Sequence, residues 1–184
     1  PLPRPWETCQ TMNGAWGFDS SKVNNYKSPD TLIHELEAVV SRDGNYLLNI
    51  GPKGDGSLTE HDIYNLTEIG KWMDIYGESI YGATRSPFSE PSWGYFTQKG
   101  NNIYCHILHP EKIHFIDVPL NELGISLKKC KKNVIQSNKG NITATELSQA
   151  ENLLKIQIYE KQVRVFLPKI THTYSSVIAI NIQQ

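Results

Sequence analysis

The stretch DGNYLLNIGPKGDG, residues 43–56, decides how the first half of the chain folds. Residues 46–50 form a nearly continuous apolar run between a glycine turn and a Gly-Pro pair, which is typical of a strand buried on both faces. Helix-like segments on both sides indicate an α/β repeat, so we expect this strand to be parallel. Loops that leave such strands face active sites, which makes residues 51–56 the first candidate region.

The two flanking helices have clear start signals. Ser28 is an N-cap followed by Pro29 and Asp30, which predicts a helix over residues 29–42 with Gly44 as its left-handed end. Thr59 and Asp62 predict the start of a second helix that Gly77 ends. The expected buried stripes are Leu32, Ile33, Leu36, Val39 and Val40 in the first helix, and Ile63, Leu66, Ile69, Met73 and Tyr76 in the second.

Residues 1–27 read as a loop with aromatic anchors, because polar and glycine residues are too dense for an amphipathic helix. Three prolines in the first five residues resemble the middle of a loop, so we expect further chain before them. Residues 1–88 thus hold roughly two α/β units, whereas a complete barrel of eight takes about 250 residues. A buried parallel strand without neighbouring strands would leave its backbone N–H and C=O groups unpaired, which is unfavourable. This part therefore needs a partner piece from the same or another polypeptide.

From about residue 89 the apolar period changes to two, which predicts an antiparallel β-sandwich of about eight short strands. Residues 99–102, Lys-Gly-Asn-Asn, are a hairpin signal. The expected strands cover residues 93–98, 103–109, 113–118, 125–131, 142–147, 153–159, 163–167 and 177–182. The fold class is therefore α/β plus all-β, with domains over residues 1–88 and 89–184.

Composition excludes several classes of function. The chain has 18 Lys+Arg against 19 Asp+Glu, so no strong field would gather nucleic acid or an anionic membrane. A neutral ligand is the better expectation, and no run approaches the ~18–20 apolar residues of a membrane span. Three cysteines without C-x-x-C spacing signal neither a zinc site nor a disulfide framework, although a Cys105–Cys130 bridge stays open.

Two motifs suggest a phosphate-binding loop and a metal site, but the sequence favours a structural explanation for both. Residues 51–56 invite a phosphate-loop interpretation, but they lack the Gly-Lys-Ser/Thr ending and hold Pro52 where a backbone donor would help. A tight strand-to-helix turn that needs positive φ explains them better. His106, His109 and His114 resemble a metal cluster, but positions three apart on a strand point to opposite faces, which favours ordinary strand histidines.

Glu7 is the candidate catalytic residue. It lies between Trp6 and a glycine-aromatic loop that, by chain order, opens on the same side as residues 51–56. A carboxyl group against an apolar ring is favoured in its neutral form, as a general acid requires. The structural alternative is a carboxylate that accepts hydrogen bonds from loop amides. Glu78 and Arg85, near the junction, are expected to be structural partners between the two halves.

Three motifs resemble the α-L-fucosidases of glycoside hydrolase family 29. They are WETCQTMNGAWGF (residues 6–18), GNYLLNIGPKGDG (residues 44–56) and GESIYG (residues 77–82), in the family's order and spacing. The resemblance implies the last α/β units of a TIM-like barrel followed by a β-sandwich. It also implies retaining hydrolysis of terminal α-linked L-fucose, without metal or organic cofactor, by an Asp nucleophile and a second carboxylic acid.

By this resemblance, Glu7 falls where several members place the general acid/base, although that position is not uniform across the family. Trp16 lies in the loop that resembles the wall of the fucose pocket, and Trp6 is the second expected substrate contact. The nucleophile has no counterpart in this chain, so we expect a C-terminal portion that is inactive alone. The implied partners are a fucosylated glycan or fucoside and the missing barrel half, and the implied location is extracellular, periplasmic or lysosome-like, with no signal visible.

Two other functions stay open. The chain could be a non-catalytic carbohydrate-binding or scaffolding module derived from such an enzyme, or a proteolytic piece without a role of its own. The mass of the native polypeptide distinguishes them, because a chain of barrel-plus-sandwich size supports the enzyme and a native chain of 20.9 kDa supports the module.

Overall fold

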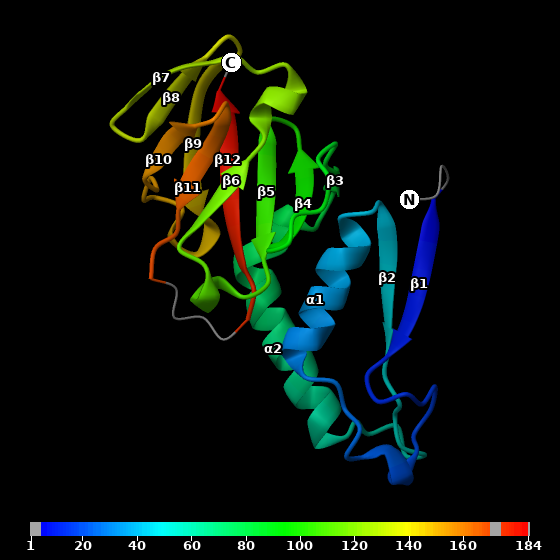
Figure 1. The fold of residues 1–184 in the computed structure, drawn as a ribbon. Helices are drawn as coiled ribbons and strands as arrows, with labels where there is room; N and C mark the ends of the chain where they lie inside the picture. Colours follow the sequence, from blue (N-terminus) through cyan, green and yellow to red (C-terminus); the bar gives the residue numbers. More distant parts are fainter. Residues whose placement is uncertain (1–4, 170–173, 184) are drawn as a thin grey trace.

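The structure is a computed structural model that describes residues 5–169 and 174–183 of the 184-residue chain (Figure 1). Two parallel strands and two helices come first, and two antiparallel sheets follow. The expected mixed class, an α/β start and an antiparallel sandwich, is confirmed. None of the helices in the described residues is long and apolar enough to cross a membrane.

The first strands are β1 (Trp6–Thr11) and β2 (Gly44–Asn49), which pair in parallel with Trp6 opposite Gly44. The parallel prediction for β2 is confirmed, whereas the expectation of a loop across residues 6–11 is wrong. Residues 6–11 form a strand because their backbone groups hydrogen-bond to β2. The segment is polar and has no apolar run from which a strand could be predicted. Burial of β2 on both faces is also wrong here, because its side chains alternate and Leu47 is 44% exposed.

Helix α1 (Pro29–Val40) starts as predicted, because the Ser28 side chain accepts a hydrogen bond from the Thr31 amide and proline takes the first helical position. The left-handed residue after it is Asp43, with φ of 59°, and not Gly44. Gly44 serves another purpose, since a β-carbon there would lie 2.4 Å from the Trp6 ring.

Helix α2 (Glu60–Tyr76) has the predicted capping box of Thr59 and Asp62. Its buried face differs from the predicted stripe, because Ile63 is 53% exposed while Trp72 is 3% exposed. Polar anchors explain this rotation: the Asn65 amide donates to the Lys27 carbonyl at 3.0 Å, and the Trp72 indole donates to the Ser175 carbonyl at 3.0 Å. These bonds turn the apolar positions Ile63 and Leu66 outward.

The antiparallel part is a sandwich of a seven-stranded and a three-stranded sheet. The large sheet has the order β3-β4-β5-β12-β9-β8-β7 and the small one β10-β11-β6. The large sheet comprises β3 (Thr84–Arg85), β4 (Gly94–Lys99), β5 (Asn102–Ile107), β7 (Leu127–Lys131), β8 (Val134–Ser137), β9 (Gly140–Glu146) and β12 (Ser176–Gln183). The small sheet comprises β6 (Phe115–Val118), β10 (Ile156–Tyr159) and β11 (Gln162–Phe166). Apolar side chains from both sheets, such as Ile107 and Val163, form the core between them.

All eight strands expected after residue 89 are present, and the short strands β3 and β8 were not predicted. β8 was not predicted because its two apolar residues, Val134 and Ile135, are adjacent and show no alternation. It is joined to β7 by a tight turn at Lys132 and Asn133, which both have positive φ. The three cysteines are free thiols, so the Cys105–Cys130 bridge does not form.

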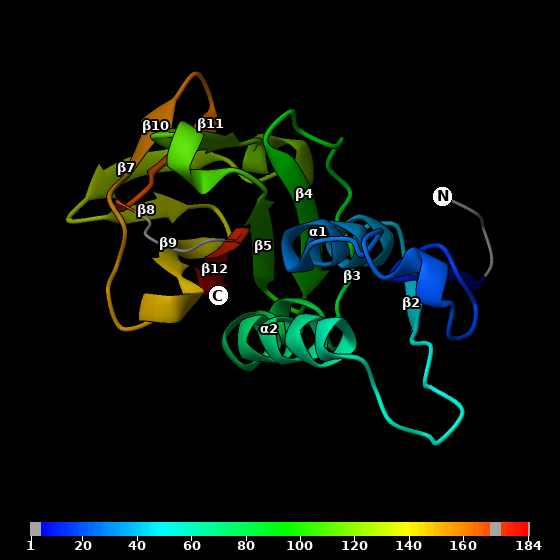
Figure 2. The ribbon, with the colours of Figure 1, turned by 90° about the horizontal axis from the view of Figure 1, so that it is seen from below.

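The helices dock on the outer face of the large sheet. Figure 2 shows α1 and α2 side by side against this sheet, with α1 next to β2. A second core fills the contact and contains Ile33, Trp72, Tyr76, Ile80, Tyr104, Val177 and Ala179. Glu78 and Arg85 are the two residues expected at this seam. Burial raises the pKa of Tyr104, and the nearby charge of Glu78 raises it further. The backbone amide of Arg85 donates to the Asp43 carboxylate at 2.6 Å.

Candidate active site

The β1–β2 sheet has one face covered by helix and one face open. On the covered face, the Trp6 indole donates to the Arg42 carbonyl at 3.0 Å, and the Tyr46 hydroxyl donates to the Glu35 carboxylate at 2.7 Å. Burial and this carboxylate raise the pKa of Tyr46 far above its ordinary value. Because side chains alternate along a strand, Glu7 and Leu47 lie on the open face. In a β/α barrel the helices lie outside, so this open face is the interior face.

Glu7 is exposed on the interior face, opposite Asn45 of β2 and 3.9 Å from the Cys9 sulfur. It is the second residue of β1, and the strand ends four residues later at Thr11. Four residues of strand span about 13 Å. Glu7 therefore lies well before the end of the strand where the following loops begin.

Trp6 and Glu7 point to opposite faces of β1. The indole of Trp6 packs against Gly44 on the helix side, where a β-carbon would overlap it. The argument that the Glu7 carboxyl rests against this ring is therefore wrong, since neighbouring strand residues cannot share a face. Trp6 instead fixes the spacing between β1 and β2.

Trp16 lies in the loop after β1, beyond the strand's carboxyl end, whereas Trp6 and Glu7 begin that strand, so the structure does not bring Trp16 together with them. Its indole is 63% exposed, and Phe18, two residues later, is 45% exposed. The side-chain amide of Asn49, the last residue of β2, donates to the Trp16 carbonyl at 3.1 Å. Sequence reasoning missed Asn49, although a polar residue at the carboxyl end of a parallel strand is a signal that could have found it.

The loops that follow β1 and β2 are joined at several further points. The Tyr26 hydroxyl lies 3.0 Å from the Thr59 hydroxyl and donates to the Asp62 carboxylate at 3.1 Å. The Tyr26 ring stacks on His61 with centroids 4.9 Å apart. Burial raises the pKa of Tyr26. The two loops therefore form one connected rim at the carboxyl ends of the strands.

The glycine-rich loop, residues 51–56, is a turn and not a phosphate cradle. Gly56 has φ of 83°, as the tight-turn interpretation requires. The Lys53 amide donates to the Ser57 carbonyl at 2.8 Å. The Asp55 carboxylate accepts from the Ser57 hydroxyl at 2.7 Å and from the Ser57 amide at 2.9 Å, and these bonds lower the pKa of Asp55. Its backbone is thus used within the loop itself.

The three histidines do not converge. His106 is fully buried between Glu37 and Thr97, while His109 and His114 are exposed. Within residues 5–169 and 174–183 no group of three histidine, cysteine or acidic side chains is arranged to hold a metal ion. The strand interpretation of these histidines is confirmed for His106, which is a residue of β5.

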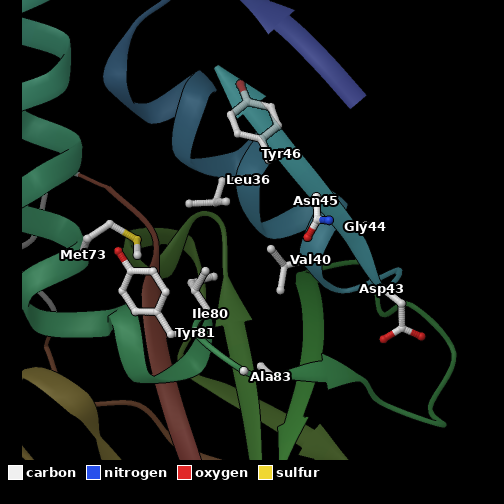
Figure 3. A pocket seen from close by; sticks show the side chains of 11 residues that line it. Leu36, Val40, Asp43, Gly44, Asn45, Tyr46, Met73, Ile80, Tyr81 and Ala83 are labelled. Carbon is white, nitrogen blue, oxygen red and sulfur yellow. The ribbon is translucent and has the colours of Figure 1, made fainter. Parts of the chain in front are cut away.

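A hollow of about 580 Å³ lies between α1, α2 and the first half of β2 (Figure 3). Leu36, Met73 and Ile80 supply much of its wall, and the side chains in Figure 3 face a common space. It is on the helix side of β2, whereas Trp16 lies beyond the other end of the strand. Its wall combines apolar side chains with polar ones such as Asp43 and Asn45, and it lies away from the carboxyl ends of the strands, where the active sites of β/α barrels form.

The fold is that of the last α/β units of a β/α barrel followed by a β-sandwich. The family model for alpha-L-fucosidase matches residues 1–78. The solved alpha-L-fucosidase isoenzyme 1 from Paenibacillus thiaminolyticus is 31% identical, aligns with 99% of this chain and 41% of its own, and has a TM-score of 0.80. The chain belongs to the α-L-fucosidases of glycoside hydrolase family 29, as a portion of the family's length.

Other relatives agree. A solved family 29 alpha-L-fucosidase from Bacteroides thetaiotaomicron, trapped as a covalent intermediate, is 25% identical over 98% of this chain and 38% of its own, with a TM-score of 0.78. The tissue alpha-L-fucosidase of Bos taurus is 36% identical over 109 residues. Those residues are 56% of this chain and 23% of the bovine protein, so the chain spans less than a quarter of that curated relative.

Proposed function

We propose that this chain is the C-terminal portion of a retaining α-L-fucosidase, a glycoside hydrolase that releases terminal α-linked L-fucose from glycans. The observation that carries the proposal is the 31% identity to the Paenibacillus enzyme across 99% of the chain. In this proposal residues 1–88 end the catalytic barrel and residues 89–184 are the sandwich domain. The substrate is a fucosylated glycan or fucoside, and the nucleophile comes from the missing barrel half.

Glu7 is the proposed general acid/base. In the first step its carboxyl proton passes to the glycosidic oxygen while the bond from that oxygen to the anomeric carbon breaks. The nucleophile's carboxylate bonds to the anomeric carbon at the same time. In the second step the Glu7 carboxylate takes a proton from water as the water oxygen attacks that carbon and releases the nucleophile. Retention needs the two carboxyl groups about 5–5.5 Å apart.

The aromatic residues have separate proposed roles. Trp16, exposed at the rim, stacks against an apolar face of the sugar. Trp6 contributes by holding β1 at its distance from β2, since its indole is occupied with Gly44 and the Arg42 carbonyl. Glu7 lies on the interior face, the side of the barrel wall from which a carboxyl group can reach a bound substrate.

The same proposal requires further protein around residues 1–88. Leu47 on the interior face is 44% exposed, and Ile63 and Leu66 on α2 are 53% and 39% exposed. The hollow beside β2, with Leu36, Met73 and Ile80 in its wall, adds to this uncovered surface. Neighbouring barrel strands and helices would bury these side chains, and each large one is worth about 1.5–3 kcal/mol when fully buried. The chain alone is therefore proposed to be incomplete for catalysis.

A second candidate function, a carbohydrate-binding module, draws on the outer face of the small sheet. Phe115 and Tyr159 are 42% and 43% exposed there, and the Arg164 guanidinium lies between their rings, 4.0 and 3.7 Å from the centroids. Asp117 holds Arg164 through two hydrogen bonds of 2.8 and 2.7 Å. Ordered aromatic rings on a β-sandwich face are able to stack on sugars. Calorimetric titration of residues 89–184 with fucosylated glycans tests this function.

Complementation tests the main proposal. The chain is joined to the barrel portion of the Paenibacillus enzyme that precedes the aligned 41%, and release of nitrophenol from an aryl α-L-fucoside is measured. We expect turnover by the joined protein and none by either part alone. A joined protein that folds, binds fucose and never turns over would exclude the catalytic role. A native polypeptide of 20.9 kDa would favour the module.

A further inference from the structure

One side-chain hydrogen bond ties the end of β2 directly to the Trp16 backbone in the loop after β1. The Asn49 amide nitrogen, at the end of β2, donates to the Trp16 carbonyl at 3.1 Å. The backbone before Trp16 is also tied, because the Gly14 amide donates to the Thr11 hydroxyl at 2.8 Å and the Ala15 amide donates to the Asn13 side chain at 3.1 Å. Trp16 thus sits on a backbone held from both sides.

A second contact lies two residues after Asn49. A β-carbon on Gly51 would lie 2.9 Å from both the carbonyl carbon and the oxygen of Gly17, and 3.0 Å from the Phe18 nitrogen. Backbone atoms cannot give way as the end of a flexible side chain can. Gly51 therefore allows the loop after β2 to touch the peptide that follows Trp16. Gly54, in the same loop, has no neighbour within 4 Å of such a carbon.

The side chain on this anchored backbone is free to meet a ligand. Trp16 is 63% exposed, although its carbonyl accepts a hydrogen bond from Asn49 and the Gly17–Phe18 peptide that comes next lies against Gly51. A large exposed aromatic on an ordered backbone loses less entropy on binding than one on a mobile loop. Indole rings stack on the C–H-rich faces of pyranose sugars.

We infer that Asn49 and Gly51 are positioning residues that hold Trp16 in place as the wall for the apolar face of a deoxy-pyranose. This inference rests on the proposed function and deepens it, because it names which residues of the second loop set the aromatic contact. Neither residue touches the reacting atoms. Their effect passes through the Trp16 backbone, so substitutions there weaken sugar binding more than they slow bond cleavage.

Fluorine NMR of the chain labelled with 5-fluorotryptophan tests the positioning. Trp6, Trp16, Trp72 and Trp93 give four signals, which Trp16→Phe assigns, and Trp72, 3% exposed, reports the fold. Asn49→Asp removes the donor and sets a carboxylate against the Trp16 carbonyl. We expect the Trp16 signal to move or broaden while the Trp72 signal stays. An unchanged Trp16 signal, or the loss of all four signals together, would overturn the inference.

Two matched controls isolate the effect. Asn138→Asp removes an equivalent bond, since the Asn138 amide donates to the Gly124 carbonyl at 3.1 Å in the sandwich. Gly51→Ala is compared with Gly54→Ala in the same loop. We expect Asn49→Asp and Gly51→Ala to shift the Trp16 signal and both controls to leave it. Equal shifts from Gly51→Ala and Gly54→Ala would contradict the close contact of Gly51 with Gly17.

Kinetics in the joined enzyme supply the second readout. One neutral hydrogen bond is worth about a 2- to 10-fold change, so we expect Asn49→Asp to raise KM by that factor and to change kcat less than about twofold. A fall in kcat at constant KM would contradict the role. If the unsubstituted joined enzyme shows no turnover, the proposed function fails on its own, while the fluorine signals still decide whether Asn49 and Gly51 position Trp16.

Discussion

Glu37 of α1 and His106 of β5, 69 residues apart, form a fully buried pair in which the Glu37 Oε1 atom lies 3.1 Å from His106 Nδ1. The Thr97 hydroxyl donates its single proton to the Ser79 carbonyl at 2.8 Å. It can therefore only accept from the His106 Nε2 atom 2.9 Å away, so that nitrogen carries a proton. The Ser175 hydroxyl also donates to Glu37, at 2.6 Å. One imidazole thus bonds the barrel-side helix to the sandwich.

Removing this imidazole should strongly destabilise the chain. In His106→Ala the Glu37 carboxylate stays buried with the Ser175 hydroxyl but without the imidazole, and breaking a buried pair in this way costs about 3–5 kcal/mol. The measurement is the free energy of unfolding in urea. His109→Ala is the matched control, because His109 is 53% exposed and 3.9 Å from Glu111, and an exposed pair of this kind is worth about 0–1 kcal/mol. Equal losses in both variants would contradict the coupling.

The two halves should depend on each other. The second core, with Trp72 and Tyr76 on one side and Tyr104 and Val177 on the other, is divided when the chain is cut after residue 88. Residues 1–88 alone should be molten or aggregated. Residues 89–184 alone should fold but unfold at lower urea than the full chain, and should not bind fucose. Sharp, dispersed amide signals from monomeric residues 1–88 would contradict this expectation.

Stability should fall in alkali through Tyr46. Burial and the Glu35 carboxylate raise the folded-state pKa of Tyr46 above its ordinary value of 10.0. The unfolded chain therefore loses this proton first, so the stabilisation is complete below about pH 10 and declines as the pH rises further. The slope per tyrosine is about 1.4 kcal/mol per pH unit. Urea unfolding between pH 9 and 11 should show a shallower slope for Tyr46→Phe, whereas the exposed Tyr81→Phe should match the unsubstituted chain.

Glu7→Gln, made in the joined enzyme, should separate a catalytic from a structural role. Without the proton donor, substrates with poor leaving groups should slow by about 10²–10⁴-fold, and aryl fucosides with good leaving groups should lose less in the first step. Azide should restore turnover by attacking the fucosyl-enzyme without a base. Equal slowing of every substrate, a lower melting temperature and no effect of azide would instead identify a structural carboxylate.

Patterns with local causes could be predicted from the sequence. The Ser28 and Thr59 caps, the parallel strand β2 and the sandwich each depend on residues close together in the chain. β1 could not be predicted, because its strand character comes from pairing with β2 about 38 positions away. The buried face of α2 was predicted in part: Tyr76 is buried as expected, with Ile69 and Met73 packed beside it. Trp72 was missed because its indole is anchored by the distant Ser175 carbonyl.

The candidate site shows the same limit. Chain order suggested that Trp6, Glu7 and Trp16 belong together, but strand alternation separates Trp6 from Glu7, and the length of β1 separates Glu7 from Trp16. Asn49 could have been noted from its place at the carboxyl end of a parallel strand, but its contact with Trp16 became evident only once the two loops were seen together. The order of motifs along the sequence therefore does not predict the distances between side chains on a strand or between loops.

The stereochemistry of hydrolysis by the joined enzyme tests the central claim most directly. Proton NMR recorded in the first minutes after an aryl α-L-fucoside is added identifies the anomer released before mutarotation. A retaining fucosidase portion predicts α-L-fucose as the first product, and no product from the 184-residue chain alone. Initial release of the β anomer, or hydrolysis by the chain without its missing barrel half, would contradict the account.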